Sequence, residues 1–304
     1  MKSLFKIFLP AFRQWREDKA PRLGAALAYY TVLSLPPLVI LLVGIAGLAL
    51  GREVVQGRVV STTQGLMGPR GAELLQQILL TTSTERRGWF ATLIGFGTLV
   101  LAASGVFGQL KDALNSIWGV EPKPGVGFLG YLRRNLFSVL TLVGTGFLLL
   151  VSLAVNGLVA ALGDVLARAL PGGETLWQIV NTVVALVVIG FTFALIFKLV
   201  PDVKVRWRDV WVGAFVTALL FVAGEWALGF YIGRTNVGSA FGAAGSLIVL
   251  LVWVYYSSQI LFFGAEYTRA WAREVGAGAR PGEDAVPVSQ QDRELQGIPR
   301  RRAG

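Results

Sequence analysis

A single carboxylate lies inside an otherwise apolar stretch of the chain. Glu225 is the one charged residue within residues 210–232. If the stretch is a helix, Ala214, Ala218 and Gly229 share its face, which points the carboxylate towards neighbouring helices rather than lipid. An ionisable group inside a membrane is costly unless it is paired or hydrated, which makes Glu225 a candidate functional residue. The alternative is a structural carboxylate that is hydrogen-bonded to a neighbouring helix.

Two further apolar stretches each carry a line of polar side chains at helical spacing. Tyr255, Gln259 and Glu266 recur at steps of four and seven, so a helix places them on one face. Polar lines of this kind either border a hydrated pathway or join helices by hydrogen bonds, and both uses are common. A second line, within residues 136–162, consists of Ser138, Thr141, Thr145, Ser152 and Asn156.

Two charged residues near the ends of these stretches are candidate contacts for ions. Arg234 belongs to the glycine-rich residues 233–246, and free amide groups at the start of the following helix can bind an anion. Arg234 is therefore a candidate contact for a phosphate or carboxylate group, and a tight turn packed with small residues is the alternative. For Glu266, an ion pair at the membrane surface with Lys198 or Lys111 is the simpler expectation.

Residue types that most enzymes depend on are absent. The chain contains no histidine and no cysteine, which removes the commonest catalytic base, the thiolate nucleophile and any disulfide. Its carboxylates are scattered along the sequence rather than clustered as ligands for one or two catalytic metal ions. We therefore expect no enzymatic activity, no cofactor and no metal site.

Six apolar stretches are long enough to cross a membrane, which takes about 20 mostly apolar residues. Apolar residues make up 54% of the 304 residues and charged residues 15%, against about 25% charged residues in soluble domains. Backbone in lipid must be hydrogen-bonded internally, so the sequence predicts an all-α integral membrane protein. It is a bundle of six transmembrane helices with short interfacial helices. The stretches are residues 24–50, 89–107, 136–162, 176–200, 210–232 and 243–268.

Lysine and arginine are distributed unevenly between these stretches. The net charge is +10, and most of the 28 basic residues lie before the first stretch, in alternate connections, or after the last stretch. By the positive-inside rule these segments face the cytoplasm, which places both termini of this multi-pass protein there. A nucleic-acid partner would need basic residues gathered on one water-exposed face, so we expect none.

The remaining segments complete the predicted domain organisation. An interfacial helix is expected over residues 3–16, with a break at Pro10. A second is expected over residues 109–118, ended by Gly119. The three regions are a cytoplasmic N-terminal arm (1–23), a six-helix transmembrane domain (24–272, with an extracytoplasmic loop at 51–88) and a disordered basic cytoplasmic tail (273–304).

Four blocks of sequence resemble one known family. They are AALAYYTVLSLPPL at 25–38, NSIWGV at 115–120, VKVRWRDVWVGA at 203–214, and residues 233–268. Together they resemble the YihY/BrkB family of bacterial inner-membrane proteins over residues 11 to about 273. The resemblance implies six helices in the plasma membrane, a link to serum resistance, and roles in moving envelope lipids or small solutes. Members have also been labelled ribonuclease BN, a reading that the missing metal ligands of this chain disfavour.

Two functional hypotheses follow. The first is a transporter or lipid-handling protein of the cell envelope, whose partners are membrane lipids, with an anionic lipid or small anionic solute as the substrate. The second is a non-transporting membrane scaffold or accessory protein that recruits partners through loop 51–88 and the basic tail. Seams of small residues also allow a homo-oligomer. The candidate pathway or substrate-contacting residues are Glu225, Asn156, Thr145, Tyr255, Gln259, Glu266 and Arg234.

Overall fold

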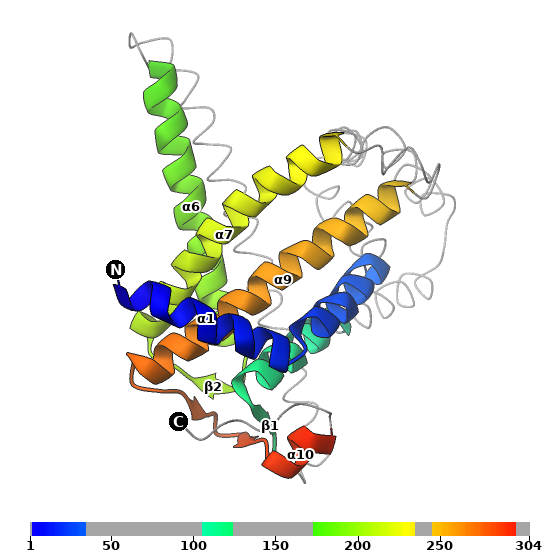
Figure 1. The fold of residues 1–304 in the computed structure, drawn as a ribbon, viewed down its shortest axis with the longest axis vertical. Coiled ribbons are helices and arrows are strands. Elements are labelled where there is room, and N and C mark those ends of the chain that lie inside the picture. The colour runs from blue at the N-terminus through cyan, green and yellow to red at the C-terminus, as the bar shows by residue number, and fades with distance from the viewer. Residues whose placement is uncertain (1, 35–104, 124–172, 235–244, 296–304) are drawn as a thin grey trace, which may run out of the picture. The chain divides into compact units, whose positions relative to one another are not determined.

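The computed structural model describes residues 2–34, 105–123, 173–234 and 245–295. These residues are mostly helical, with a few short strands (Figure 1). Loop 51–88 and the predicted stretch 136–162 lie outside them. The chain divides into two compact units, each described by itself: unit 1 comprises Met1–Pro21, Leu110–Gly224 and Gln259–Gly304, and unit 2 comprises Arg22–Gln109 and Glu225–Ser258.

Three long helices match three of the predicted stretches. They are α6 (Gly173–Leu199), α7 (Trp207–Arg234) and α9 (Gly245–Glu274). Each contains a span long and apolar enough to cross a membrane, at Thr182–Leu199, Trp207–Leu228 and Leu247–Glu274. Large apolar side chains on these helices remain exposed, with Trp226 at 77%. Such surfaces suit hydrocarbon rather than water as the surrounding medium.

Helices α7 and α9 pack against each other through two Gly-x-x-x-Thr motifs. A Cβ atom at Gly213 would lie 1.8 Å from Thr268 Oγ1, and one at Gly264 would lie 1.9 Å from Thr217 Oγ1. Each threonine hydroxyl donates to the carbonyl of the glycine four residues earlier, at 2.6 Å for Thr217 and 2.7 Å for Thr268. The glycine of each helix thus meets the threonine of the other, so the helices run antiparallel with their backbones in close approach.

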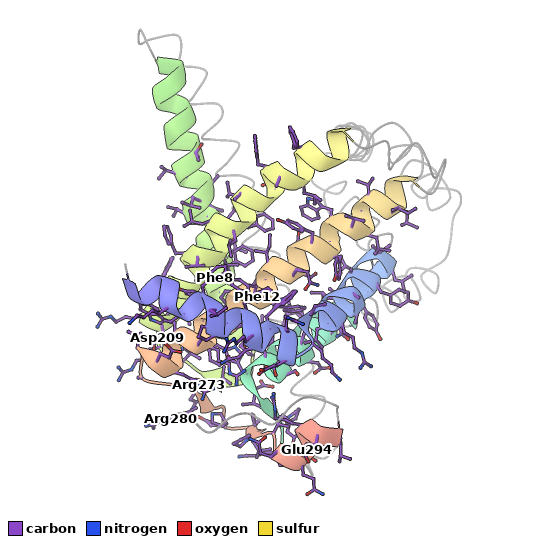
Figure 2. The ribbon with its side chains drawn as sticks, viewed as in Figure 1. Phe8, Phe12, Asp209, Arg273, Arg280 and Glu294 are labelled. Atoms are coloured by element: carbon purple, nitrogen blue, oxygen red, sulfur yellow. The ribbon has the colours of Figure 1, made fainter. Side chains whose placement is uncertain are left out.

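The N-terminal helix α1 (Lys2–Glu17) packs on the C-terminal half of α9. Ile7 and Ala11 are buried against Phe263, Tyr267 and Ala270. The exposed residues Phe8 and Phe12 follow one another along α1 (Figure 2).

The predicted break at Pro10 is wrong, because α1 is continuous through that residue. Proline removes one backbone donor and crowds the preceding turn. Ile7 and Ala11, on either side of Pro10, are both buried in the contact with α9. We attribute the continuity of the helix to this packing.

Residues 273–304 were expected to be a disordered tail, and the structure corrects this for residues 280–295. Strand β3 (Arg280–Pro281) pairs antiparallel with β2 (Val203–Lys204), and β4 (Ala285–Pro287) pairs antiparallel with β1 (Val120–Pro122). The short helix α10 (Gln290–Leu295) follows. The tail is ordered here because two earlier segments supply hydrogen-bonding partners for its backbone, which composition alone does not reveal.

The helical residues 105–118 end at Gly119, as the sequence predicts. Gly119 has a φ of 70°, a left-handed conformation that glycine adopts without steric cost. Strand β1 begins at the next residue, so this turn leads the chain directly into its pairing with β4.

Candidate functional site

Unit 1 brings together the four segments that the charge pattern assigns to one side of a membrane. Strand pairs, ion pairs and side-chain hydrogen bonds join them to one another. We call them the cap segments: residues 2–19, 110–123, 200–209 and 273–295.

Four charged side chains are buried together in unit 1, two acidic and two basic. The Arg269 Nη1 atom lies 3.2 Å from Asp18 Oδ2 and 3.5 Å from Glu266 Oε2, and Arg293 Nη2 lies 2.6 Å from Asp18 Oδ1. Arg269 also donates to the backbone carbonyl of Ile117. Buried charges are tolerated when they are paired and hydrogen-bonded in this way. Because this cluster is enclosed, we assign it the role of holding cap segments together.

The expected partners of Glu266 need correction. Its ion pair is with Arg269, one turn later on α9, and not with Lys198 or Lys111. Lys111 instead pairs with Asp202 at 2.9 Å, and Lys198 donates to the carbonyl of Val205. Because α9 continues to Glu274, beyond the predicted end at residue 268, it carries Arg269 as part of the same helix.

A second connection joins the residues before β1 to the loop before β2. The Asn115 side chain donates to Asp202 Oδ2 at 3.0 Å and accepts from the Asp202 backbone N–H at 2.8 Å. The Asp202 carbonyl in turn accepts from the Gly282 N–H at 2.8 Å. Asn115 and Asp202 thus hold three cap segments in register.

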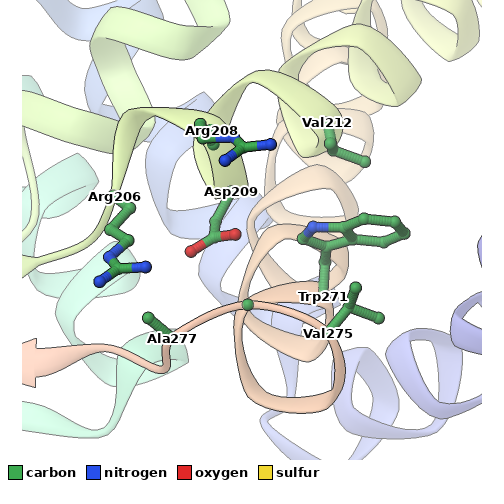
Figure 3. A pocket seen from close by; sticks show the side chains of 8 residues that line it. Arg206, Arg208, Asp209, Val212, Trp271, Val275 and Ala277 are labelled. Carbon is green, nitrogen blue, oxygen red and sulfur yellow. The ribbon is translucent and has the colours of Figure 1, made fainter.

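A pocket of about 370 Å³ opens beside the first turn of α7 and the end of α9 (Figure 3). Both sides of the pocket belong to unit 1. Its wall combines basic, acidic, aromatic and small residues. They include Arg206, Arg208, Asp209, Val212, Trp271 and Gly276.

Asp209 is the buried polar group of this pocket. The residue is 6% exposed, and its Oδ2 atom has no hydrogen-bond partner among the described residues. A Cβ atom at position 276 would lie 2.5 Å from Asp209 Oδ1, so glycine leaves room for the carboxylate in its present position. Arg206 and Arg208 border the carboxylate in Figure 3, and neither forms an ion pair with it. Asp209 can therefore accept hydrogen bonds from a bound group.

The residues singled out from the sequence occupy different environments. Glu225 is exposed on α7, whereas Ala214 and Ala218, which were expected to share its face, are fully buried. Along α9, Tyr255 and Gln259 are half-buried and Glu266 is fully buried. Both amide atoms of Gln259 lack a hydrogen-bond partner within the described part of the chain.

The structure says less about the other three candidates, Arg234, Thr145 and Asn156. Arg234 is the last residue of α7, and Thr145 and Asn156 lie outside the described residues. The pocket beside Asp209 contains none of the seven candidates. Sequence reasoning missed Asp209 because it lies next to basic residues, where a carboxylate is unremarkable. The available signal was its position at the start of an apolar stretch, inside the block at 203–214.

Comparison with known proteins identifies the family. The family model described as "Virulence factor BrkB" matches residues 11–288. A UPF0761 membrane protein of Pseudomonas paraeruginosa is 29% identical over 266 residues, which cover 84% of this chain and 62% of the relative. Another, from Xanthomonas campestris pv. campestris, is 31% identical over 260 residues, covering 84% and 58%.

The chain therefore spans about three fifths of the length of these relatives. No solved structure matches it. The family model covers all three long helices and, from residue 11 onwards, the cap segments up to β4. The chain belongs to the virulence factor BrkB (YihY) family of membrane proteins.

Proposed function

We propose that this protein spans the bacterial inner membrane six times, with both termini in the cytoplasm, and moves a lipid or a small anionic solute across it. The observation that carries the proposal is Glu225, an exposed carboxylate within the apolar span Trp207–Leu228. A carboxylate at such a position needs water, a polar headgroup or a substrate beside it. A pathway through the membrane supplies that environment.

The cap segments support the six-span arrangement. All four belong to unit 1, and two predicted apolar stretches separate each from the next along the chain. A chain that leaves one side of a membrane and returns to it has crossed an even number of times. The antiparallel contact between α7 and α9 agrees with this for the last two crossings. The excess of basic residues in the cap segments favours the cytoplasmic side.

Transport by the reconstituted protein tests the proposal. The full chain is placed in liposomes, and movement of fluorescent phospholipids and of radiolabelled small anions is measured separately. We expect the wild type to move one of these classes faster than protein-free liposomes do. Glu225→Gln removes the charge while preserving shape, and should slow movement by about tenfold or more, the effect of losing one charged contact.

Glu274→Gln is the matched control, because Glu274 is an exposed carboxylate at the end of α9 rather than within the apolar part of α7. Its rate should equal that of the wild type. The proposal fails if the wild type moves neither class of substrate. Wild-type rates in Glu225→Gln would remove Glu225 from the pathway.

A further inference from the structure

We propose that the pocket beside Asp209 binds the headgroup of an aminophospholipid, with the ammonium group on the Asp209 carboxylate and the phosphate on Arg206 and Arg208. The inference rests on the proposed lipid-handling function and names the chemical class of lipid. Three features support it: an unsatisfied buried acceptor, two bordering cations, and the position of the pocket at the ends of two apolar spans.

The Asp209 Oδ2 atom receives no hydrogen bond from the described residues. Its Oδ2 atom is enclosed and unpartnered, which is costly for a charged acceptor. The first turn of a helix favours an acidic residue, and that accounts for aspartate at this position. It does not account for a carboxylate oxygen that receives no hydrogen bond in this pocket. A primary ammonium group carries three N–H donors and a positive charge, which meets both needs.

The arginines make the site suited to a zwitterion rather than to a simple cation. Arg206 and Arg208 are exposed, and their guanidinium groups border the Asp209 carboxylate in Figure 3. A guanidinium group matches phosphate oxygens with two parallel hydrogen bonds. A ligand that carries only a negative charge would be repelled by Asp209, and a ligand that carries only a positive charge would be repelled by Arg206 and Arg208. Phosphoethanolamine carries one group of each sign, a short distance apart.

The pocket lies where a headgroup would be found. The apolar span of α7 begins at Trp207, and that of α9 ends at Glu274, so the pocket is at the ends of both spans. Trp207 and Trp211, in the first turns of α7, are exposed, as is typical of residues at membrane interfaces. Val212 and Trp271 give its wall an apolar side for the glycerol end of a lipid. A volume of about 370 Å³ falls within the range of about 300–1,000 Å³ for small-ligand sites.

Lipid binding to the purified full-length protein tests the assignment. Phosphatidylethanolamine, phosphatidylcholine and phosphatidylglycerol with identical acyl chains are titrated in detergent, and bound lipid is counted by native mass spectrometry. Phosphatidylcholine has no N–H donor and phosphatidylglycerol has no cation. We therefore expect wild-type protein to bind phosphatidylethanolamine at least about tenfold more tightly than either, the effect of one charged hydrogen-bonding contact. Equal affinities for all three lipids would overturn the proposal without any variant.

Two variants assign the interaction to residues. Asp209→Asn should reduce the affinity for phosphatidylethanolamine to that for phosphatidylcholine, and an unchanged preference would overturn the role of Asp209. Arg206→Gln/Arg208→Gln should weaken binding of all three lipids, since each contains a phosphate. Lys204→Gln/Arg280→Gln is the matched control, because it removes two positive charges from the β2–β3 pair, outside the pocket. It should bind each lipid as the wild type does.

A soluble competitor separates the two sources of this headgroup. If free phosphoethanolamine displaces the lipid at equal concentration, the acyl chains contribute nothing and the assignment to a lipid is overturned. Binding is measured at equilibrium, so it is independent of movement across a bilayer. Selective binding of phosphatidylethanolamine without movement in liposomes would support this site and contradict the transport proposal. Movement in liposomes without selective binding would support transport and contradict this site.

Discussion

At the scale of single residues, Arg269 connects three parts of unit 1 through one guanidinium group. It pairs with Asp18 after α1 and with Glu266 on α9, and donates to the carbonyl of Ile117 before β1. Arg293 of α10 then pairs with the other oxygen of Asp18. Because these side chains are buried, each depends on its partners for the interactions that water would otherwise provide.

Removing the charge of Asp18 should therefore destabilise the protein strongly. Asp18→Asn leaves the buried guanidinium groups of Arg269 and Arg293 without this shared anion, and breaking a buried pair typically costs about 3–5 kcal/mol. We expect a clearly lower unfolding temperature in detergent, followed by circular dichroism. Glu283→Gln is the control, because Glu283 and its partner Lys204 are 85% and 63% exposed and exposed pairs contribute little. Equal unfolding temperatures for the two variants would contradict this role of Asp18.

The exposed ion pair between Lys204 and Glu283 should be detectable in a pH titration of Glu283. A hydrogen bond from Lys204, followed by its positive charge, holds the pKa of the Glu283 carboxyl below its ordinary value. A lowered pKa in the folded state adds stability above the ordinary pKa, and this stability is lost as the pH falls through the lowered pKa. We expect Lys204→Ala to raise the pKa of Glu283, measured by carbon NMR of labelled glutamate. A pKa unmoved by the substitution would mean that the pair does not persist in solution.

At this scale the sequence identifies residue types but not partners. Glu225 stands out because a lone carboxylate in an apolar stretch is rare, and in the structure it lies on α7. The pairs of Asp18 join residues 251 and 275 positions apart. No helical period links such positions, so only the packed fold reveals them.

At the scale of elements, the two Gly-x-x-x-Thr motifs determine how closely α7 and α9 pack. Gly213→Ala would place a Cβ atom 1.8 Å from Thr268 Oγ1 and 2.9 Å from the Thr268 Cα atom. A side-chain rotation relieves the first contact but not the second, so the helices must move apart. We expect a loss of about 1–3 kcal/mol, as for other overpacked positions, measured by unfolding in detergent.

Gly190→Ala on α6 is the matched control, because it makes the same chemical change at a position where an added Cβ atom fits. Its Cβ atom would lie 3.7 Å from Ala218 Cβ, an ordinary contact. Alanine also favours a helix over glycine by about 1 kcal/mol, so this variant should be as stable as the wild type or more stable. Similar losses for the two glycine variants would mean that close approach at Gly213 is not the cause.

The elements divide clearly into those that a sequence predicts and those that it does not. Length and hydropathy identified α6, α7 and α9, because membrane insertion depends on those properties alone. The strands β2 and β3 are two residues long and exist only through pairing with each other, about 80 positions apart. Nothing local in the sequence marks strands of this length.

At the scale of the whole molecule, two deletions of different length at the C-terminal end should have different effects on stability. Removing residues 296–304 takes away Arg300, Arg301 and Arg302 and leaves α10 intact. Removing residues 275–304 also takes away β3, β4 and the pair between Arg293 and Asp18. We expect the shorter deletion to retain the wild-type unfolding temperature and liposome transport, and the longer one to lower the unfolding temperature.

The shorter deletion also separates the transporter from a scaffold that recruits partners through a basic tail. A scaffold should lose recruitment when the three arginines are removed, while its fold remains intact. Loss of liposome transport in the shorter deletion would contradict the expectation that residues 296–304 are dispensable for transport. The longer deletion cannot decide between the two, because it disrupts the cap segments themselves.

The ion pair between Asp18 and Arg293 also imposes an order on biosynthesis. Asp18 leaves the ribosome early, yet its partner is translated 275 residues later. At about 5–20 residues per second, the interval is roughly 14–55 seconds. For most of that time Asp18 lacks both of its guanidinium partners, because Arg269 is itself translated 251 residues after it. This buried network of ion pairs is therefore complete only after residue 293 has been synthesised.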